Sequence, residues 1–494
     1  MNQSSLLQSY QEQPNVWDEM FSAGGIRSPY KNFVSAVEDL PPAEMTHKDE
    51  MAKKLFMSQG ITFTVYNSGE GIEKIFPFDI IPRIITSDEW ALLEAGLKQR
   101  LKALNVFLKD IYHRQFILND GIIPAQLIYS CPNFLREMVN VDVPFDIYTH
   151  VSGVDLIRDE DGKFYVLEDN LRTPSGVSYM LENRSITYRI FPDLLPKNNV
   201  RSVKEYPDLL YKNLLALGNR QISNPTVILL SPGIYNSAYF EHTTLARLMG
   251  IELVEGRDLI VDNNYVYMKT TKGLQQVDVI YRRVDDEFID PLVFRPDSIL
   301  GVSGLYWAYR KGNVAIVNAM GNGVADDKAI YTYVPDMIRY YLNEEPILQN
   351  IPTFQLADED SKKYVFENIN KMVIKRTNES GGYGMLMGNV AGDEEIQNFK
   401  NAINAEPRNF IAQHIISLSS TPCYINGILQ PRRVDLRPFA LYGPEGINIV
   451  PGGLTRVALK EGSMIVNSSQ GGGSKDTWVL AGSSALASWG GNHR

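Results

Sequence analysis

Two β-prone runs joined by an Asp-Gly pair constrain the fold of this chain more than any other stretch. The runs span Val151 to Arg158 and Lys163 to Asn170, and Asp161-Gly162 lies between them. An Asp-Gly pair between two such runs is the strongest short signal for a tight turn. The sequence therefore predicts a β-hairpin here.

The register of this hairpin decides whether it carries chemistry. A two-residue turn places Asp155 opposite Glu168, whereas a four-residue turn places Asp155 opposite Val166. Opposed side chains have Cβ atoms about 4.5–5.5 Å apart, and two carboxylates that close repel unless a positive charge lies between them. Asn170 falls on the same face as Glu168, because the pleat of a strand repeats every two residues.

These three oxygen donors indicate a divalent cation. A set of Asp, Glu and Asn without His or Cys favours Mg²⁺ or Mn²⁺ over zinc. A solvated hairpin with acidic residues at its edge is the alternative, and the residues that follow weigh against it. Arg172 and Gly176 precede a helical pattern from Val177 to Tyr188, so a guanidinium group and backbone N–H groups are offered to a phosphate.

The same residues resemble a family signature. Glu168-x-Asn170-x-Arg172 resembles the metal-binding Glu-x-Asn-x-Arg motif of ATP-grasp ligases, and Asp155 matches their upstream metal-binding Asp. In ordinary members this motif follows the lysines and the glycine-rich loop that hold ATP, but here it precedes them. This order resembles the circularly permuted ATP-grasp family, relatives of glutathionylspermidine synthetase, from about Gly60 to Leu480. The resemblance implies an α/β chain with α+β elements, a permuted ATP-grasp fold and an inserted Rossmann-like pre-ATP-grasp domain.

The length of 494 residues is too great for one ordinary core, so two or three packed domains are expected. Apolar runs from Thr226 and Ile251 flank a helical pattern, which predicts a β–α–β unit. That unit lacks G-x-G-x-x-G, so no dinucleotide site is expected. The predicted parts are an N-terminal arm or irregular cap (1–59), a permuted C-terminal ATP-grasp part with the metal-binding hairpin (60–218), the pre-ATP-grasp domain (219–330), an ATP-grasp part with nucleotide lysine, glycine-rich loop and hinge (331–480), and a mobile tail (481–494).

A lysine at the end of a strand leads into a glycine-rich loop. Lys375 closes a short apolar run, and Gly381, Gly382 and Gly384 follow it. Glycines let successive backbone N–H groups approach a polyphosphate without Cβ clashes, while the lysine supplies a point charge. The pattern is neither a Walker A motif nor a protein-kinase loop. It predicts a nucleotide-binding loop, with an ordinary flexible hairpin as the alternative.

Two further nucleotide contacts follow from the resemblance. Lys328 resembles the first nucleotide lysine of ATP-grasp enzymes, with a plain surface lysine as the alternative. The run from Phe410 to Ile416 resembles the hinge strand whose backbone groups bind adenine, which implies roles for Gln413 and Ile415. Apolar neighbours of that strand would then sandwich the base.

Charged residues alternate with apolar ones near the end of the chain. Arg433, Asp435 and Arg437 share one face of a predicted strand, and charges on an inner face are costly unless they meet ligand charge. A strand that faces the surface would explain them equally. The resemblance implies that Arg437 binds nucleotide and that Arg456 and Asn467 are catalytic, near phosphate and metal.

Arg283 is a further predicted catalytic residue, together with Arg172. It follows the predicted strand Val277 to Tyr281, and the C-terminal ends of strands in open α/β sheets face the ligand crevice. Arginine suits a clamp for a substrate carboxylate or an acyl phosphate. Ion pairs with Asp285 and Asp286 are the alternative.

Composition excludes several function classes. The net charge of −10 argues against a nucleic-acid or acidic-membrane partner. There is no apolar run of eighteen residues and the polar start is no signal peptide, so a cytoplasmic protein is expected. The two cysteines, Cys131 and Cys423, and the six histidines show no zinc-binding spacing.

Together the motifs predict a carboxylate–amine ligase that uses ATP and Mg²⁺ (or Mn²⁺) and acts through an acyl phosphate. Its partners would be a small-molecule or peptide carboxylate and an amine, whose identities the sequence does not give, and neither does it give the oligomeric state. The alternatives are an ATP-binding scaffold without catalysis and an ATP-grasp phosphotransferase. The metal carboxylates and Lys375 favour activity, and no histidine stands in a phosphohistidine-like setting.

Overall fold

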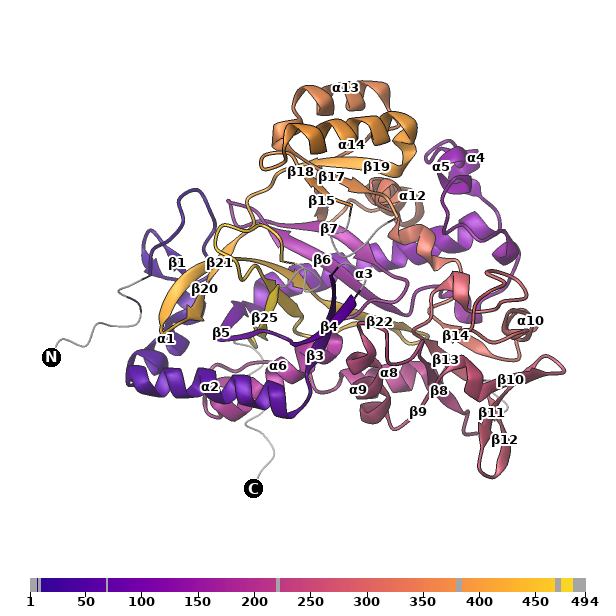
Figure 1. Ribbon diagram of the computed structural model, residues 1–494, viewed down its shortest axis with the longest axis horizontal. Coiled ribbons are helices and arrows are strands. Elements are labelled where there is room, and N and C mark those ends of the chain that lie inside the picture. Colours follow the sequence, from indigo (N-terminus) through magenta and orange to yellow (C-terminus); the bar gives the residue numbers. More distant parts are fainter. Residues whose placement is uncertain are drawn as a thin grey trace.

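The computed structural model describes residues 7, 10–67, 70–218, 223–378, 384–466 and 472–482. Three principal sheets with helices on their outer sides make up the fold (Figure 1). The helices are α1 (Lys31–Glu38), α2 (Pro42–Ser58), α3 (Ser87–Tyr112), α4 (Phe116–Asn119), α5 (Ala125–Tyr129), α6 (Val177–Ile190), α7 (Leu194–Lys197), α8 (Tyr206–Leu215), α9 (Tyr239–Met249), α10 (Leu305–Arg310), α11 (Lys328–Tyr331), α12 (Val334–Leu342), α13 (Glu359–Glu367) and α14 (Asp393–Ala405).

The large sheet combines strands from both ends of the chain. Its order is β15 (Gln349–Asn350), β7 (Phe164–Asn170), β6 (Val151–Arg158), β21 (Ile428–Arg437), β24 (Leu454–Val457), β25 (Gly473–Val479) and β5 (Phe78–Ile85). Beside this path, β20 (Ser420–Ile425) pairs with β21, and β22 (Phe439–Gly443) pairs with β23 (Gly446–Ile449) and β6. The predicted metal-binding hairpin therefore lies next to strands from the end of the chain.

The β6–β7 hairpin forms as predicted, but its turn does not. Near the turn Leu156 pairs with Val166, which fits neither a two-residue nor a four-residue turn. The register then shifts by one residue, and Asp155 pairs with Glu168. Such a shift marks a β-bulge, in which two residues of one strand oppose one of its neighbour. The predicted carboxylate pair is thus present because Leu167 is the extra residue of a bulge.

A small antiparallel sheet lies apart from the large one, at the top of Figure 1. Its order is β16 (Thr353–Gln355), β19 (Phe410–His414), β17 (Met372–Arg376) and β18 (Leu386–Met387). Helices α13 and α14 cover its outer side (Figure 1), and their apolar residues join Ile374 and Phe410 in a separate core cluster. This unit carries the predicted lysine strand and hinge strand.

A third sheet is parallel, as the β–α–β pattern predicts. Its order is β14 (Ala315–Val317), β13 (Val279–Arg282), β8 (Val227–Leu230) and β9 (Glu252–Val254). A three-stranded antiparallel extension consists of β10 (Leu259–Asp262), β11 (Tyr265–Thr270) and β12 (Gly273–Val277). The predicted strands are confirmed, and the domain boundaries stay a prediction.

The N-terminal region is more regular than the sequence indicated. Residues 31–58 form α1 and α2 in place of an irregular cap, and two short hairpins accompany them, β1 (Phe21–Ser22) with β2 (Gly25–Ile26) and β3 (Thr62–Asn67) with β4 (Glu70–Ile75). Helix α3 starts at a capping box, in which Thr86 and Glu89 exchange hydrogen bonds. None of the described helices has both the length and the apolar character that a membrane-spanning helix needs.

Candidate functional site

A cleft between the small sheet and the large sheet gathers residues from distant parts of the chain. Its empty volume, open solvent included, is about 960 Å³. The predicted site residues that line it are Asp155, Glu168, Lys328, Lys375, Gln413, Ile415 and Arg456. The two hairpin carboxylates therefore face one space with the later cations, whereas Asn170 is not among the described residues of the lining.

Asp155 is held firmly at the floor of this site. Arg437 donates from Nε to Asp155 Oδ1 at 2.5 Å and from Nη2 to Oδ2 at 2.8 Å. Arg456 Nη2 donates to the same Oδ2 at 2.7 Å. Burial opposes ionisation, but the two guanidinium groups outweigh it and hold the pKa of Asp155 below its ordinary value. Asp155 is therefore a fixed negative charge at neutral pH.

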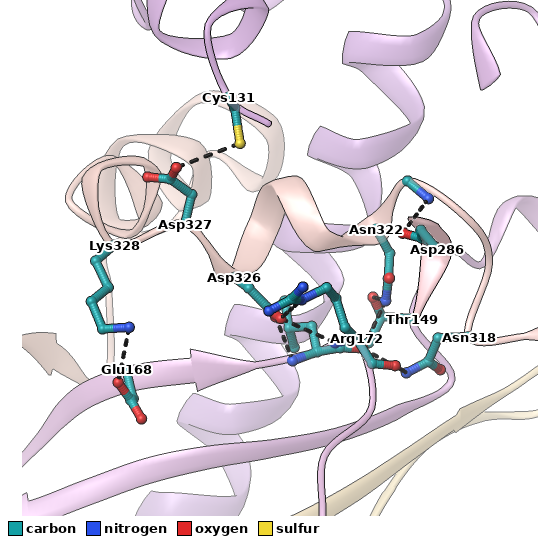
Figure 2. Close-up of polar contacts among 12 residues, drawn as sticks. Cys131, Thr149, Glu168, Arg172, Asp286, Asn318, Asn322, Asp326, Asp327 and Lys328 are labelled. Carbon is teal, nitrogen blue, oxygen red and sulfur yellow. Dashed lines mark hydrogen bonds and ion pairs between the residues drawn. The ribbon is translucent and has the colours of Figure 1, made fainter. Parts of the chain in front are cut away.

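Two lysines provide the positive charge beside Glu168. Lys328 Nζ lies 3.5 Å from Glu168 Oε2 (Figure 2). Lys375 Nζ donates to Gln413 Oε1 at 2.9 Å, and Gln413 in turn donates to Thr353 Oγ1 at 2.9 Å. Burial lowers the pKa of Lys375 to about 8, against the opposing charge of Glu168. The charge of Lys375 is therefore sensitive to pH and to an anion in the cleft.

Apolar side chains from both sheets and from neighbouring loops complete the lining. They are Ile157, Leu167, Ile351, Val373, Met385, Met387, Ile416, Leu418, Met464, Ile465 and Val466. A flat aromatic base suits such opposed apolar walls. The backbone N–H of Ile415 donates to the carbonyl of Lys371 at 2.9 Å, so this N–H is already used within the protein. Ile415 could therefore contact a base only through its carbonyl group or its side chain.

Three of the predicted arginines do not line the cleft themselves, although Arg437 is bound to Asp155. Among the described residues that line the cleft, Arg172, Arg283 and Arg437 are absent. Arg172 Nε binds Asp326 at 2.8 Å (Figure 2), and Asp326 also accepts from the backbone N–H of Leu171. These contacts fix the segment that follows β7. Arg172 is therefore placed to position the loop that leaves the metal-binding strand.

Arg283 serves the same loop from the parallel sheet. Its Nη1 donates to Pro174 O at 2.8 Å, and its Nη2 donates to Ser175 Oγ at 2.5 Å. One ion pair with the following acids does form, but on the preceding residue, because Arg282 Nη2 lies 2.7 Å from Asp286 Oδ1. The acidic neighbour of Arg283 itself is Glu241 at 3.4 Å. Arg283 is fully enclosed by these contacts, with 5% of its surface exposed. In this structure Arg283 is therefore not arranged to bind a substrate directly.

Glu241 explains why the N-terminus of α6 is not open to a phosphate. Its Oε2 accepts hydrogen bonds from the backbone N–H groups of Gly176 at 2.8 Å and Ser178 at 3.0 Å. A buried carboxylate at this position satisfies donors that would otherwise await an anion. The phosphate contact predicted for Gly176 is thus replaced by an internal cap.

Of the other predicted site residues, the structure describes two and leaves three outside its described ranges. Asn170 is half-buried on β7 opposite Gly153, and its amide nitrogen has no hydrogen-bond partner among the described residues. Gly384 has a φ of 62°, a backbone conformation that favours glycine. The remaining predicted residues, Gly381, Gly382 and Asn467, lie outside the described residues.

Sequence reasoning assigned no role to the acids that organise the site. Asp435 lines the cleft and binds Arg456 Nε at 2.9 Å, although its alternation with arginines was visible in the sequence. Asp326 and Glu241 gave no signal, because their partners are distant in the chain. Figure 2 shows how Asp326, Asp327 and Lys328, at consecutive positions, reach three separate partners.

The hairpin donors have the oxygen chemistry that suits a magnesium ion. Asp155, Glu168 and Asn170 offer the hard oxygen ligands that Mg²⁺ prefers. Asp155 Oδ1 accepts one hydrogen bond, so a carboxylate lone pair remains for a cation. Within the described part of the chain, no group of three or more His, Cys, Asp and Glu forms a complete metal cluster. A cation here would take further ligands from water and phosphate, as Mg²⁺ at nucleotide sites does.

Two sheets that enclose a cleft with paired carboxylates, lysines and apolar walls define an ATP-grasp fold. The model of the family described as "Circularly permuted ATP-grasp type 2" matches residues 82–458. The chain belongs to the circularly permuted ATP-grasp family. The resemblance and the fold class predicted from the sequence are thereby confirmed.

Relatives from several bacteria match nearly the whole chain. An uncharacterised protein of Synechocystis is 52% identical, with 97% of this chain and 99% of the relative covered. A protein of Frankia casuarinae named as a candidate glutamate–cysteine ligase is 39% identical, over 96% of this chain but 54% of its own length. The solved apo structure of a glutathione synthetase-like effector from Globodera pallida superposes with a TM-score of 0.58 at 12% identity, covering 90% of this chain and 98% of that one. That likeness shows the fold alone.

Proposed function

We propose that this protein is a ligase that joins a carboxylate to an amine at the expense of ATP, with Mg²⁺, through an acyl phosphate. One observation supports the proposal above the others. A single cleft holds Asp155 and Glu168 on one hairpin together with Lys328, Lys375 and Arg456. Carboxylates for a metal and cations for phosphate oxygens are the two requirements of phosphoryl transfer from ATP.

In this proposal the apolar walls hold the adenine and the cations hold the triphosphate. Lys375 and Lys328 neutralise phosphate charge as point charges, while the guanidinium of Arg456 offers directed donors. Asp155, Glu168 and Asn170 would hold Mg²⁺, which supplies charge neutralisation at the β- and γ-phosphate oxygens. The contacts of Arg172 and Arg283 keep the loop after β7 in place, so we assign them positioning roles.

The proposed reaction has two displacement steps. A carboxylate oxygen of the substrate attacks the γ-phosphorus, the bond to the β–γ bridging oxygen breaks, and ADP leaves. The amine nitrogen then attacks the acyl carbon, phosphate leaves with the C–O electron pair, and the nitrogen loses a proton. The protein contributes position and fixed charge without a covalent bond to substrate.

The acid and the amine are open to experiment. The Frankia relative carries a glutamate–cysteine ligase name, but this chain spans 54% of that protein, so the name describes a longer polypeptide. Glutamate and cysteine therefore belong in a substrate screen beside other amino acids, short peptides and polyamines. We also propose that the parts 60–218, 219–330 and 331–480 are the domains that bring these substrates to the cleft.

The test is an ADP-release screen with ATP, Mg²⁺ and paired mixtures of carboxylates and amines, followed by mass spectrometry. The proposal expects ADP release that requires both substrates and an amide product. Release of a stable phosphorylated product without an amine would establish a phosphotransferase. Saturable ATP binding with no stimulated hydrolysis by any mixture would favour the scaffold alternative.

A further inference from the structure

A second cavity lies on the opposite face of the large sheet from the nucleotide cleft. Ile157 lines the cleft, and the next residue of β6, Arg158, lines the second cavity. Successive side chains of a strand point to opposite faces, so the two cavities are separated by the sheet. The second cavity has an empty volume of about 820 Å³, and much of its wall comes from the N-terminal region that includes Trp17 and Arg27.

This cavity carries an excess of positive charge in an acidic protein. Arg27, Lys31 and Arg158 line it, against the two acids Glu19 and Glu89. Both acids already have partners. Arg83, outside the lining, donates to Glu19 at 2.5 Å.

Glu89 is engaged in the same way. It accepts from the backbone of Thr86 at 2.9 Å, in the capping box of α3, and from Arg158 Nη1 at 2.8 Å. The acids are thus committed to the protein. Arg158 is in turn committed to them, because its Nε also lies 3.5 Å from Glu19 Oε1. Arg27 and Lys31 therefore carry the excess positive charge of the cavity.

Two buried donors of this cavity have no acceptor. Arg158 is 3% exposed, and its Nη2 has no hydrogen-bond partner among the described residues. The indole Nε1 of Trp17 is also buried and unpartnered within that part of the chain. A buried donor without an acceptor is destabilising, and the loss is greater for a charged group. An oxygen-bearing anion is the kind of acceptor that such donors need.

The wall that carries these donors is fixed by packing. Gly162, at the tip of the β6–β7 hairpin, has a φ of 82°, and a Cβ there would come within 2.6 Å of the Trp17 ring. The guanidinium of Arg27 lies over the indole ring, 3.6 Å from its centroid, and Arg27 Nε donates to Asp18 O at 2.8 Å. Trp17 is therefore held in one orientation, which is what a specific site requires.

We propose that this cavity, formed by Trp17, Arg27, Lys31 and Arg158, binds a small oxyanion bearing a carboxylate or a phosphate. The arginines suit planar or tetrahedral oxygen groups, and Lys31 adds charge at the rim. The site is distinct from the nucleotide cleft and gives the N-terminal region a binding role. The inference does not depend on the ligase reaction, because it rests on the opposite face of the sheet.

The test is calorimetric titration of the full-length protein with inorganic phosphate and, separately, with succinate at constant ionic strength. The variant Arg27→Gln/Lys31→Gln changes two side chains at the mouth of the cavity without removing the buried Arg158. Its matched control is Arg257→Gln/Lys272→Gln, which changes the same charges on an exposed surface elsewhere. Trp17→Phe removes the indole donor and keeps an aromatic ring.

We expect saturable binding of at least one anion to the wild type and to the control. The dissociation constant should rise at least tenfold in Arg27→Gln/Lys31→Gln and at least threefold in Trp17→Phe. Preference for phosphate or for succinate identifies the charged group of the ligand. Absence of saturable binding by both anions would overturn the proposal, and so would equal affinity in the Arg27→Gln/Lys31→Gln variant and its control.

Discussion

Asp155 lies directly opposite Glu168 on neighbouring strands, with a β-bulge beside the pair. The bulge has a chemical consequence, because Leu167 and Glu168 both line the cleft although they are adjacent in sequence. Regular alternation would send one of them to the other face. One short strand segment therefore supplies an apolar wall and a carboxylate to the same site.

The first prediction concerns the charges that the proposed reaction needs. Glu168→Gln and Lys375→Ala should each lower substrate-stimulated ADP release at least a hundredfold, since loss of one preorganised charge contact raises a barrier by about 2.7–4 kcal/mol. Both side chains line the cleft, so circular dichroism should show an intact fold. The exposed Glu367→Gln on α13 is the control and should keep full activity. Retained ADP release in either cleft variant would defeat the assignment.

Individual residues show which parts of the site could be predicted from the sequence. Lys375, Gln413 and Glu168 could be predicted because each stands in a local pattern of strand and motif, and all three line the cleft. Arg172 and Arg283 lie near the cleft, beside the loop that follows β7, but do not line it. Their partners, however, are decided by long-range packing that a local pattern does not encode.

The hairpin register shows the same limit. A two-residue turn at Gly162 predicted the correct Asp155–Glu168 pair for an incorrect reason, because the turn and the bulge each shift the register and their effects cancel. Propensity identifies that a hairpin exists, but a bulge depends on what the strand packs against. Glu241 was unpredictable for a related reason, since the helix end that it caps lies on another part of the chain.

A second prediction follows from the pKa of Lys375, which burial lowers to about 8. The ammonium form dominates below that pH and binds phosphate, so ATP affinity should be nearly constant below pH 7. Above pH 8 binding must also take up a proton, and the dissociation constant of ATP should rise about tenfold per pH unit. Lys375→Arg stays charged throughout and should flatten the profile between pH 7 and 10. Calorimetric titration with ATP across this range is the measurement, and identical profiles would refute the role of Lys375.

A third prediction concerns acid stability. Two arginines hold the pKa of Asp155 below its ordinary value, so its ionised form stabilises the folded state above about pH 4, the usual range of Asp. That contribution is lost as pH falls toward the lower folded-state pKa. Asp155→Asn should therefore unfold more easily in urea at pH 7, by about 3–5 kcal/mol for a broken buried ion pair. The difference in free energy of unfolding between the wild type and Asp155→Asn should become smaller between pH 5 and 3. A difference that is constant with pH would contradict this reasoning.

The last prediction separates structural from catalytic charge around the loop after β7. Glu241 is fully buried, caps α6 through Gly176 and Ser178, and lies 3.4 Å from Arg283. Glu241→Gln keeps the shape but removes the charge, so the free energy of unfolding should fall by about 1.5–3 kcal/mol, the contribution of hydrogen bonds to a charged group. The exposed Glu252→Gln should be neutral.

A double-mutant cycle with Arg283→Met then measures the coupling between the two side chains. Because Glu241 and Arg283 share one buried cluster, their effects on urea unfolding should be non-additive by about 0.5–3 kcal/mol. If Arg283 only positions the loop, then Arg283→Lys, which keeps the charge, should restore part of both stability and ADP release. If Arg283 instead contacts substrate directly, its variants should lose activity without any coupling to Glu241 in the unfolding measurements.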